Sequence, residues 1–499
     1  MKRILAVLAA SALLASFAAG AKTAAIPDRP EKLRFEPLKF EVPDADQYRH
    51  VLSNGVPVYI VEDHSLPLVN LSVVVRAGSF LDPEGKAGLA SLTGTMLRRG
   101  GTEKMSAEEF DERADFLAAN ISSFVGDISG SASLDCTTFV LDEAMGLFFD
   151  MLRSPRFQQD RLDIEKTNLI ERFKQRNDDA GAILNREWRF LMFGEDHYSA
   201  RQATKPSIDA ISRDDLVAFH RNYFHPGNFI VWASGDVDTK SLLARLEESF
   251  AGWEPAKVKV PWPPPATTHE PVPGVYHVEK DIPQGKVYYG HEAPRWKRWD
   301  DPDMYALMVM NDILGGGGFT SRITKKIRSD EGLAYSAGSR LNLGIVDRGL
   351  FFVSFQSKNP TVALAAKLSR ELIEQMRSEE VSEEELRVSK NSFIDAFPRR
   401  FESADAVART FAFDEYYGRP HSYWSEYRKR IAAVDTGDVL RVAKKYLHPE
   451  RMLLLVVGKW DEIAPGDPDH RASMSEFYGG KVTHLPLRDP LTMEPLPQR

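Results

Sequence analysis

Apolar and polar residues alternate at the start of the folded part of the chain. The stretch VLSNGVPVYIVED, residues 51–63, alternates on both sides of an Asn-Gly pair, which is typical of a tight β-hairpin. A β-branched run, VNLSVVVRAGS (69–79), predicts a strand after it. Helices are expected next, one over Ala107–Ala119 behind an N-capping Ser106 and a longer one around Asp160–Arg176.

Two later segments share one order of elements. In each, an amphipathic helical pattern stops at a His-Pro pair and an apolar strand follows, FIVWAS (229–234) in one case and MLLLVV (452–457) in the other. Strands followed by helices, rather than strict alternation of the two, indicate an α+β fold. We expect a mainly antiparallel sheet covered by helices in each part.

The chain is internally duplicated. Residues 207–236 align without gaps on residues 430–459, and the pair His-Pro falls on His-Pro at a constant offset. A second match sets residues 153–173 on 377–397 at nearly the same offset. Two matches at one spacing indicate two homologous domains.

The duplication and the local composition together predict five segments along the chain. We expect an N-terminal domain over 45–250 and a C-terminal domain over 276–462, joined by a Pro-rich linker, 251–275. A polar, Pro-rich tail over 463–499 is expected to lie along the surface. Residues 1–21 have the pattern of a secretory signal peptide.

The signal-like segment begins with the basic residues Lys2 and Arg3, continues as an apolar run from Ile4 to Phe17 and ends in small residues. The run is too short for a comfortable membrane span, and no later segment offers the roughly 18 uninterrupted apolar residues that a spanning helix needs. The pattern therefore predicts export to the periplasm, without stable insertion into the membrane and without a lipid-anchoring cysteine.

Composition excludes several classes of function. The single cysteine, Cys136, rules out an internal disulfide, and its apolar surroundings favour a buried packing role. The net charge is −8 and no long Lys/Arg cluster is present, so nucleic acid is not an expected partner.

Several segments resemble a known family. They are GLASLTGTMLRRGGT (88–102), DLVAFHRNYFHPGNF (215–229) and GLAYS (332–336), on a duplicated background. In this combination the chain is similar to the pitrilysin/insulinase-type zinc peptidases, family M16, which include the mitochondrial processing peptidases. The resemblance implies the processing-peptidase fold.

In active members an H-x-x-E-H motif follows Gly-Leu-Ala: two histidines on one helix face bind zinc and the glutamate activates water. Laid on this chain, the motif puts Ser91 and Thr95 at the histidine positions and Gly94 at the glutamate position. The third ligand would fall at Arg172, with Glu171 beside it, and a guanidinium cannot bind zinc. The resemblance therefore implies that this chain binds no metal and holds no cofactor of its own.

No other residues offer an obvious replacement site. No two histidines are four residues apart; His220 and His225 are five apart, and His225 belongs to the His-Pro helix end. Ser91 lacks the G-x-S-x-G surroundings of a serine nucleophile. Hydrolysis by this chain alone is therefore not favoured. It would predict chelator-sensitive activity in the purified protein.

The second half carries Arg328 and Tyr335, seven residues apart in IRSDEGLAYS. The resemblance implies that this pair reaches the peptide near the scissile carbonyl in the zinc subunit's site. The alternative is structural: a surface arginine on a helix and an aromatic residue in the core of a strand.

A glycine run precedes this pair and consists of Gly315, Gly316, Gly317 and Gly318. No Gly-Lys-Ser/Thr follows, which argues against nucleotide binding. The run can serve as a flexible turn, and the resemblance adds that a comparable loop touches substrate in non-catalytic processing-peptidase subunits.

Two functional hypotheses follow. In the first, the chain is the metal-free, substrate-binding subunit of a two-chain periplasmic peptidase, with zinc in a homologous partner that bears H-x-x-E-H. In the second, it is a metal-free module that binds peptides or scaffolds other envelope proteins, with no peptidase partner.

Overall fold

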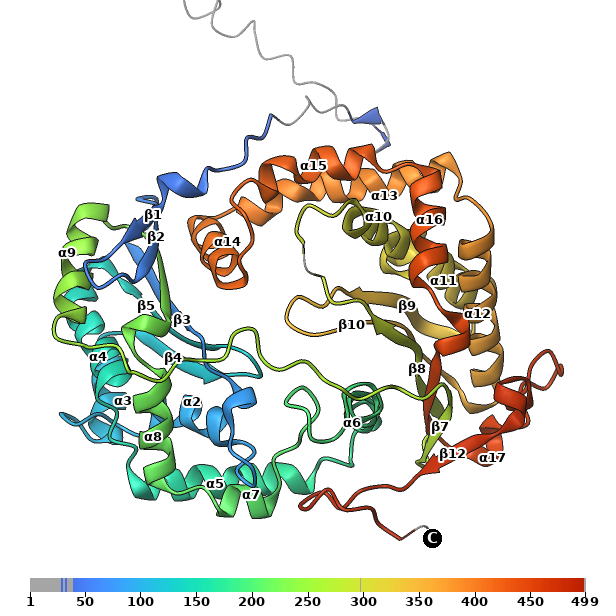
Figure 1. Cartoon of the computed structure of the whole chain (residues 1–499), viewed down its shortest axis with the longest axis horizontal. Helices are drawn as coiled ribbons and strands as arrows, with labels where there is room; N and C mark the ends of the chain where they lie inside the picture. The colour runs from blue at the N-terminus through green and yellow to red at the C-terminus, as the bar shows by residue number, and fades with distance from the viewer. Residues whose placement is uncertain (1–27, 30–31, 34–38, 297, 498–499) are drawn as a thin grey trace, which may run out of the picture. The chain divides into compact units, whose positions relative to one another are not determined.

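Two six-stranded sheets organise the chain, each with helices packed against it (Figure 1). The predicted signal peptide, residues 1–21, lies outside the described residues. Residues Val42–Arg499 form one compact unit. The computed structural model describes residues 28–29, 32–33, 39–296 and 298–497.

The first sheet has the strand order β1-β2-β6-β3-β5-β4. All neighbouring strands are antiparallel except β2 and β6, which are parallel. Its strands are β1 Arg49–Val51, β2 Pro57–Glu62, β3 Leu68–Val75, β4 Asn120–Val125, β5 Gly130–Thr137 and β6 Phe229–Gly235.

The second sheet repeats this order as β12-β7-β11-β8-β10-β9, with β12 in the place of β1. Here β7 runs parallel to both β11 and β12, and the remaining neighbours are antiparallel. The predicted α+β class, with two mainly antiparallel sheets, is therefore confirmed. The strands are β7 Gly274–Glu279, β8 Gln284–Ala293, β9 Ala334–Asn342, β10 Gly349–Lys358, β11 Leu453–Gly458 and β12 Val482–Leu485.

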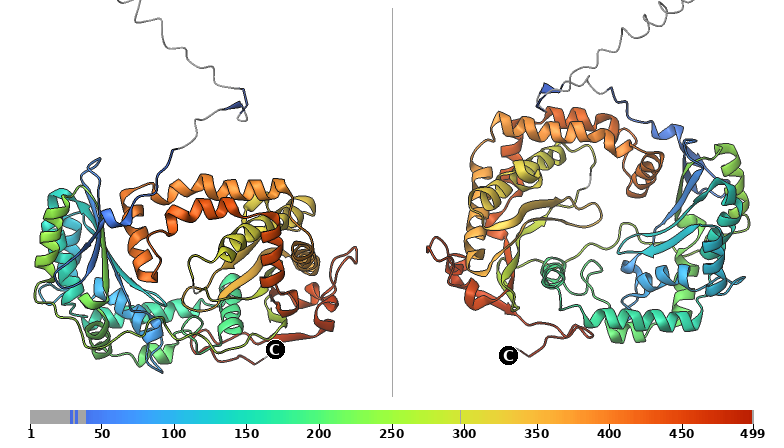
Figure 2. Two further views of the ribbon diagram at one scale, coloured as in Figure 1. Left: turned by 45° about the horizontal axis from the view of Figure 1, so that its top comes forward. Right: turned by 180° about the vertical axis from the view of Figure 1, so that it is seen from behind.

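Helices cover both sheets, as Figure 2 shows from two further directions. Helix α4 packs against β5, and α12 packs against β8 and β10. None of the helices in the described part of the chain is long and apolar enough to cross a membrane. The helices are α2 Leu89–Arg99, α3 Ala107–Phe116, α4 Leu141–Arg153, α5 Gln159–Lys174, α6 Ala180–Phe193, α7 Lys205–Asp209, α8 Arg213–Tyr223, α9 Thr239–Phe250, α10 Pro302–Asn311, α11 Arg322–Thr324, α12 Val362–Ser378, α13 Glu383–Ala396, α14 Ala404–Tyr417, α15 Tyr423–Ala433, α16 Thr436–Tyr446 and α17 Trp460–Ile463.

Local sequence signals account for several of these elements. Strands β1 and β2 pair across the Asn-Gly turn, where Gly55 takes a left-handed φ of 86°. Helix α3 begins behind Ser106, whose side chain accepts a hydrogen bond from the backbone N–H of Glu109 in a capping box. It ends at Phe116, before the predicted Ala119, because the backbone of Ala118 is left-handed.

The two halves exchange one helix each. Helix α6, from the first half, packs against β8 and β11 of the second sheet. Helix α14, from the second half, packs against β2 and β6 of the first sheet. Because Ala180 and Ala404, the first residues of these helices, are separated by the same offset as the internal repeat, the two helices are equivalent elements.

A polar cluster fixes α14 on the first sheet. The guanidinium of Arg49 in β1 donates two hydrogen bonds of 2.9 Å to the carboxylate of Glu415 in α14. The hydroxyl of Tyr59 in β2 donates a third, of 2.6 Å, to the same carboxylate. A bidentate, partly buried pair of this kind restricts the helix to one position.

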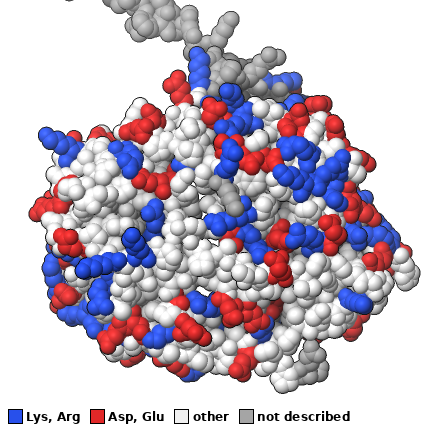
Figure 3. All heavy atoms as spheres, in the orientation of Figure 1, with Lys and Arg blue, Asp and Glu red and all other residues white. Residues whose placement is uncertain are grey.

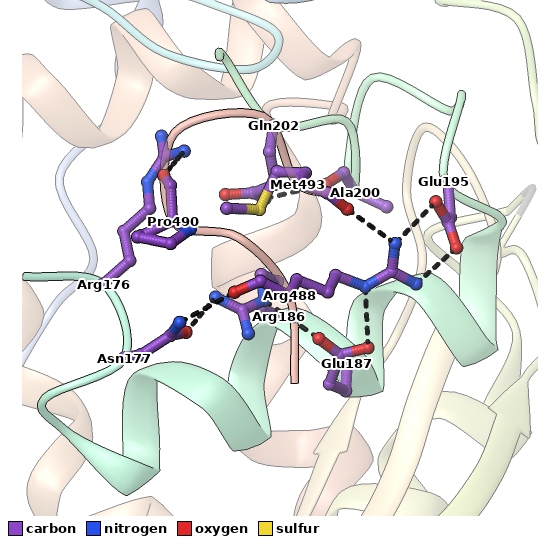
Figure 4. Close-up of polar contacts among 10 residues, drawn as sticks. All are labelled: Arg176, Asn177, Arg186, Glu187, Glu195, Ala200, Gln202, Arg488, Pro490 and Met493. Carbon is purple, nitrogen blue, oxygen red and sulfur yellow. Dashed lines mark hydrogen bonds and ion pairs between the residues drawn. The ribbon is translucent and has the colours of Figure 1, made fainter. Parts of the chain in front are cut away.

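The tail after residue 463 is integrated into the fold more deeply than its composition predicts. Its strand β12 extends the second sheet beside β7, with His484 opposite His277. Beyond it, Arg488 donates to Glu187 of α6 at 3.4 Å and pairs with Glu195 at 2.5 Å (Figure 4). The side chains of Arg488 and Glu187 are only 12% and 3% exposed, so the tail makes a buried ionic contact with α6 rather than only lying along the surface.

Candidate functional site

Helix α2 carries the positions where the resemblance places a metal motif. The buried carboxylate of Asp82 accepts hydrogen bonds from the backbone N–H groups of Gly88 and Ala90, at 2.8 and 2.7 Å, and so fixes the first turn. Burial raises the pKa of Asp82 to about 6. Gly88 precedes the helix with a φ of 102°, a conformation that favours glycine.

The three motif positions have different surroundings. Ser91 is exposed, and its carbonyl oxygen accepts a hydrogen bond from the hydroxyl of Thr95 at 3.1 Å. Gly94 is buried against β4, where a Cβ would lie 2.5 Å from the backbone nitrogen of Val125. The hydroxyl of Ser123 donates to the Gly94 carbonyl at 2.6 Å, which holds strand and helix together.

These residues do not fit a zinc ion. Hydroxyls replace both imidazoles, and the place of the carboxylate has no room for a side chain. On α5, Arg172 and Glu171 are both exposed, and Glu171 pairs with Lys174 at 2.6 Å. The described residues contain no group of three or more His, Cys, Asp or Glu side chains placed to hold a metal.

The histidines His220 and His225 have structural surroundings. The Nε2–H of His220 donates to the carbonyl of Leu152 at 2.7 Å inside the protein. His225 lies beside Asn228 at 3.1 Å and precedes the short turn that leads into β6. Cys136 is buried, and burial raises the pKa of its thiol to about 11.

Arg328 and Tyr335 form an exposed stack with Phe319. The guanidinium carbon of Arg328 lies 4.4 Å from the ring centre of Phe319 and 4.7 Å from that of Tyr335. Tyr335 is 84% exposed and Phe319 is 68% exposed, although both are large aromatic residues. The structure thus places Tyr335 at the surface, not in the core of the strand.

Local backbone geometry produces this stack. Arg328 lies in a π-helical turn, Lys325–Asp330, and Tyr335 lies near the start of the edge strand β9. π-Helical turns are rare and are found frequently at functional sites. In the described part of the chain, no hydrogen bond or ion pair occupies the Arg328 guanidinium, so its N–H groups are available to a ligand.

The glycine run joins the π-helical turn Asp312–Gly316 to the 3₁₀ turn Gly318–Thr320, which carries Phe319. Gly315 is packed so closely on β9 that a Cβ would lie 2.3 Å from the backbone nitrogen of Ser339. At Gly316 and Gly317, a Cβ would come within 2.8 Å of Asn311 and Asp312, respectively. Gly318 has a φ of 62° and open space around it. Close packing at the first three glycines and the left-handed backbone at Gly318 therefore account for this run.

Sequence reasoning missed Phe319. It follows the glycine run directly, but an aromatic residue in so short a turn has no periodic or capping signal that would assign it to a site. Only the three-dimensional structure shows that it forms the second ring of the Arg328 stack.

Comparison with known proteins identifies the family. Residues 58–199 match the model described as insulinase (peptidase family M16), and residues 210–393 match the peptidase M16 inactive domain. The protein named non-peptidase homolog YmxG of Helicobacter pylori is 28% identical over 372 residues, which cover 74% of this chain and 84% of that protein.

Two further matches agree. Zinc protease PqqE of Helicobacter pylori is 24% identical over 408 residues, covering 79% of this chain and 89% of that one. The crystal structure titled peptidase M16 inactive domain from Pseudomonas fluorescens superposes with a TM-score of 0.72 at 24% identity, over 82% of this chain and 97% of that chain. Both halves of the chain thus match models of one family, and the chain belongs to peptidase family M16.

Proposed function

We propose that this chain is the non-catalytic, substrate-binding subunit of a two-chain M16-type metallopeptidase. The zinc ion is held by a homologous partner that bears H-x-x-E-H. The observation that carries the proposal is the contact between Gly94 and Val125, which leaves no space for the carboxylate that active members place there. The helix is kept as a packing element while its chemistry belongs to the other chain.

Arg328 and Tyr335 are the groups that this chain contributes. Hydrolysis of a peptide builds negative charge on the carbonyl oxygen, and a guanidinium and a phenol can both donate hydrogen bonds to it. Stacking between the rings of Phe319 and Tyr335 holds the guanidinium of Arg328 in place before substrate arrives. Donors that are already oriented can contribute a few kcal/mol to such a step.

The relatives support a division of labour. Helicobacter pylori has both a protein named non-peptidase homolog and a protein named zinc protease that match this chain along most of their length. A non-peptidase homolog and a zinc protease of one family in one organism support the division of labour that a two-chain enzyme would have. Export to the periplasm is part of the proposal and rests on the apolar leader between Ile4 and Phe17.

A second function is a metal-free module that binds peptides or scaffolds envelope proteins. A group of exposed apolar side chains favours it: Leu66, Leu68 and Phe139 are 60%, 49% and 87% exposed. Their loops are neighbours, because the backbone N–H of Thr138 donates to the carbonyl of Pro67 at 3.1 Å. Exposed apolar groups of this kind often mark sites of protein association.

Affinity capture from the native cells distinguishes the two functions. The tagged mature chain is recovered from the periplasm, bound proteins are identified by mass spectrometry, and zinc and peptide hydrolysis are measured in the eluate. The proposal predicts a stoichiometric partner with H-x-x-E-H, zinc and chelator-sensitive hydrolysis. An eluate without such a partner and without zinc would favour the second function.

A further inference from the structure

A basic pocket of about 630 Å³ lies between α10, α13, α14 and α15, away from the Arg328 stack in the sequence. Three arginines line it: Arg399, Arg400 and Arg409. Its walls include the aromatic side chains of Phe397 and Tyr427, and one carboxylate, that of Glu402, also lines it.

The segment FPRRF, residues Phe397–Phe401, builds one side of this pocket as a short 3₁₀ turn. Its two phenylalanines are buried, and the ring of Phe397 stacks on Tyr427 with centroids 5.1 Å apart. Both rings also contact Trp424. The aromatic anchors fix the turn, so Arg399 and Arg400 between them are held at the pocket.

The positive charge of the pocket is only partly compensated within the described part of the chain: Glu402 lines the pocket, and the buried carboxylate of Asp414 acts on Arg400. No hydrogen bond or ion pair there involves the guanidinium groups of Arg399, Arg400 or Arg409. Arg400 lies over the ring of Trp424 at 4.3 Å. Burial, together with the nearby charge of Arg419, lowers the pKa of Arg400. An anion in the pocket would favour the charged guanidinium and so offset the repulsion from Arg419.

The basic surface over α16 differs from this pocket, because its cations are paired with a carboxylate. Figure 3 shows Lys and Arg side chains gathered near this helix, on a face where both signs of charge otherwise mix. There Arg441 and Lys445 both pair with the carboxylate of Asp303. That surface is neutralised from within, whereas the pocket arginines lack such a partner.

We propose that this pocket binds the carboxylate of an acidic residue in a peptide, so that the chain selects peptides that carry Asp or Glu. The planar guanidinium fork matches a carboxylate with two parallel hydrogen bonds. The partly exposed ring of Phe393, which also lines the pocket, suits the apolar part of a peptide chain, and the net charge of −8 opposes long polyanions such as nucleic acid. The inference rests on the peptide-binding role proposed above and names its substrate class.

The test measures peptide binding to the purified mature chain by fluorescence anisotropy. The probes are a rhodamine-labelled octapeptide GSEESGSG and its neutral counterpart GSQQSGSG. The variant is Arg399→Gln/Arg409→Gln, two exposed positions whose loss leaves no partner unpaired. The matched control is Arg221→Gln, which removes an exposed arginine from α8. Thermal unfolding of each variant checks that the fold is kept.

The glutamate peptide should bind at least about tenfold more tightly than the glutamine peptide, and the double variant should abolish this difference while Arg221→Gln keeps it. Affinity should fall as salt rises. Equal affinity for the two peptides, or a preference that survives in the double variant, would overturn the inference.

Two further arms separate the related outcomes. A phosphoserine peptide that binds more tightly than the glutamate peptide through the same arginines would overturn the assignment of a carboxylate. Because the assay needs no partner subunit, its failure is distinct from failure of the proposed function. If an H-x-x-E-H partner is captured but the two peptides bind with equal affinity, only the selection of acidic peptides is overturned, and the proposed function stands.

Discussion

Gly94 of α2 and Val125 of β4 approach so closely that a Cβ on Gly94 would lie 2.5 Å from the Val125 backbone nitrogen. Real Cβ atoms essentially never come this near to a backbone atom. Gly94, which the resemblance aligns with the catalytic glutamate of active family members, therefore cannot be replaced by a residue with a side chain unless helix and strand separate. This packing agrees with the metal-free role that we propose for the first half.

Gly94→Ala should lower the free energy of unfolding by about 1–3 kcal/mol, because the added methyl group forces α2 away from β4. In an exposed helix the same change would stabilise by about 1 kcal/mol. Urea denaturation of the mature chain measures the difference. Ser91→Ala, at an exposed position of the same helix, should stay within about 0.5 kcal/mol of the wild type. An alanine variant as stable as the wild type would contradict the packing argument.

Restoring the two histidines should not restore the metal. Ser91→His/Thr95→His supplies two imidazoles, but the resemblance places the exposed Arg172 at the third-ligand position. We expect the dialysed double variant to retain well under one zinc per chain, measured by elemental analysis beside the wild type. One tightly held zinc per chain would show that other residues complete the site.

The buried contact between the tail and α6 should contribute strongly to stability. Arg488→Ala removes the tail partner of the 3% exposed carboxylate of Glu187, which keeps its pair with Arg186 at 2.9 Å, so we expect a loss of about 1.5–3 kcal/mol. The control is Arg387→Ala, whose exposed pair with Glu384 is worth at most about 1 kcal/mol. Chemical denaturation compares the two variants, and equal effects would contradict the role assigned to the tail.

Stability should depend on pH through His220. Burial lowers the pKa of His220 from its ordinary 6.5 to about 4, so between these values the unfolded chain binds a proton that the folded chain does not. The contribution of neutral His220 to the free energy of unfolding is fully present above pH 6.5 and is lost as pH falls toward 4. The free energy of unfolding should fall by about 1–3 kcal/mol less between pH 8 and pH 5 in His220→Gln than in the wild type, and the glutamine can still donate to Leu152. Urea unfolding at pH 8, 6 and 5 measures this, with pH 8 giving the cost of the substitution itself. An unchanged slope would show that His220 does not titrate in this range.

Much of the architecture follows from local signals in the sequence. The Asn-Gly turn before Val56 and the Ser106 cap predicted real elements, and the duplicated segments predicted two sheets of one topology. The exchange of α6 and α14 was not predicted, since amphipathic patterns show that a face is buried but not which sheet buries it. The repeat offset that relates Ala180 to Ala404 would have identified the two helices as equivalent.

The candidate site was only partly accessible to sequence reasoning. The resemblance pointed to Arg328 and Tyr335, and their roles remain a proposal. Tyr335 lies on an edge strand, where the alternating pattern does not distinguish a core ring from an exposed one. The steric limit at Gly94 depends on a distance between helix and strand that no pattern encodes.

Kinetics of the assembled pair test the central claim most directly. The partner alone, this chain alone and the two together are assayed for peptide hydrolysis, and the pair is then assayed with Arg328→Ala or with the control Arg387→Ala. We predict hydrolysis only by the pair, a loss of about 100-fold in kcat/KM for Arg328→Ala, and no change for the control. Hydrolysis by this chain alone, or a pair whose kcat/KM is unaffected by Arg328→Ala, would contradict the claim.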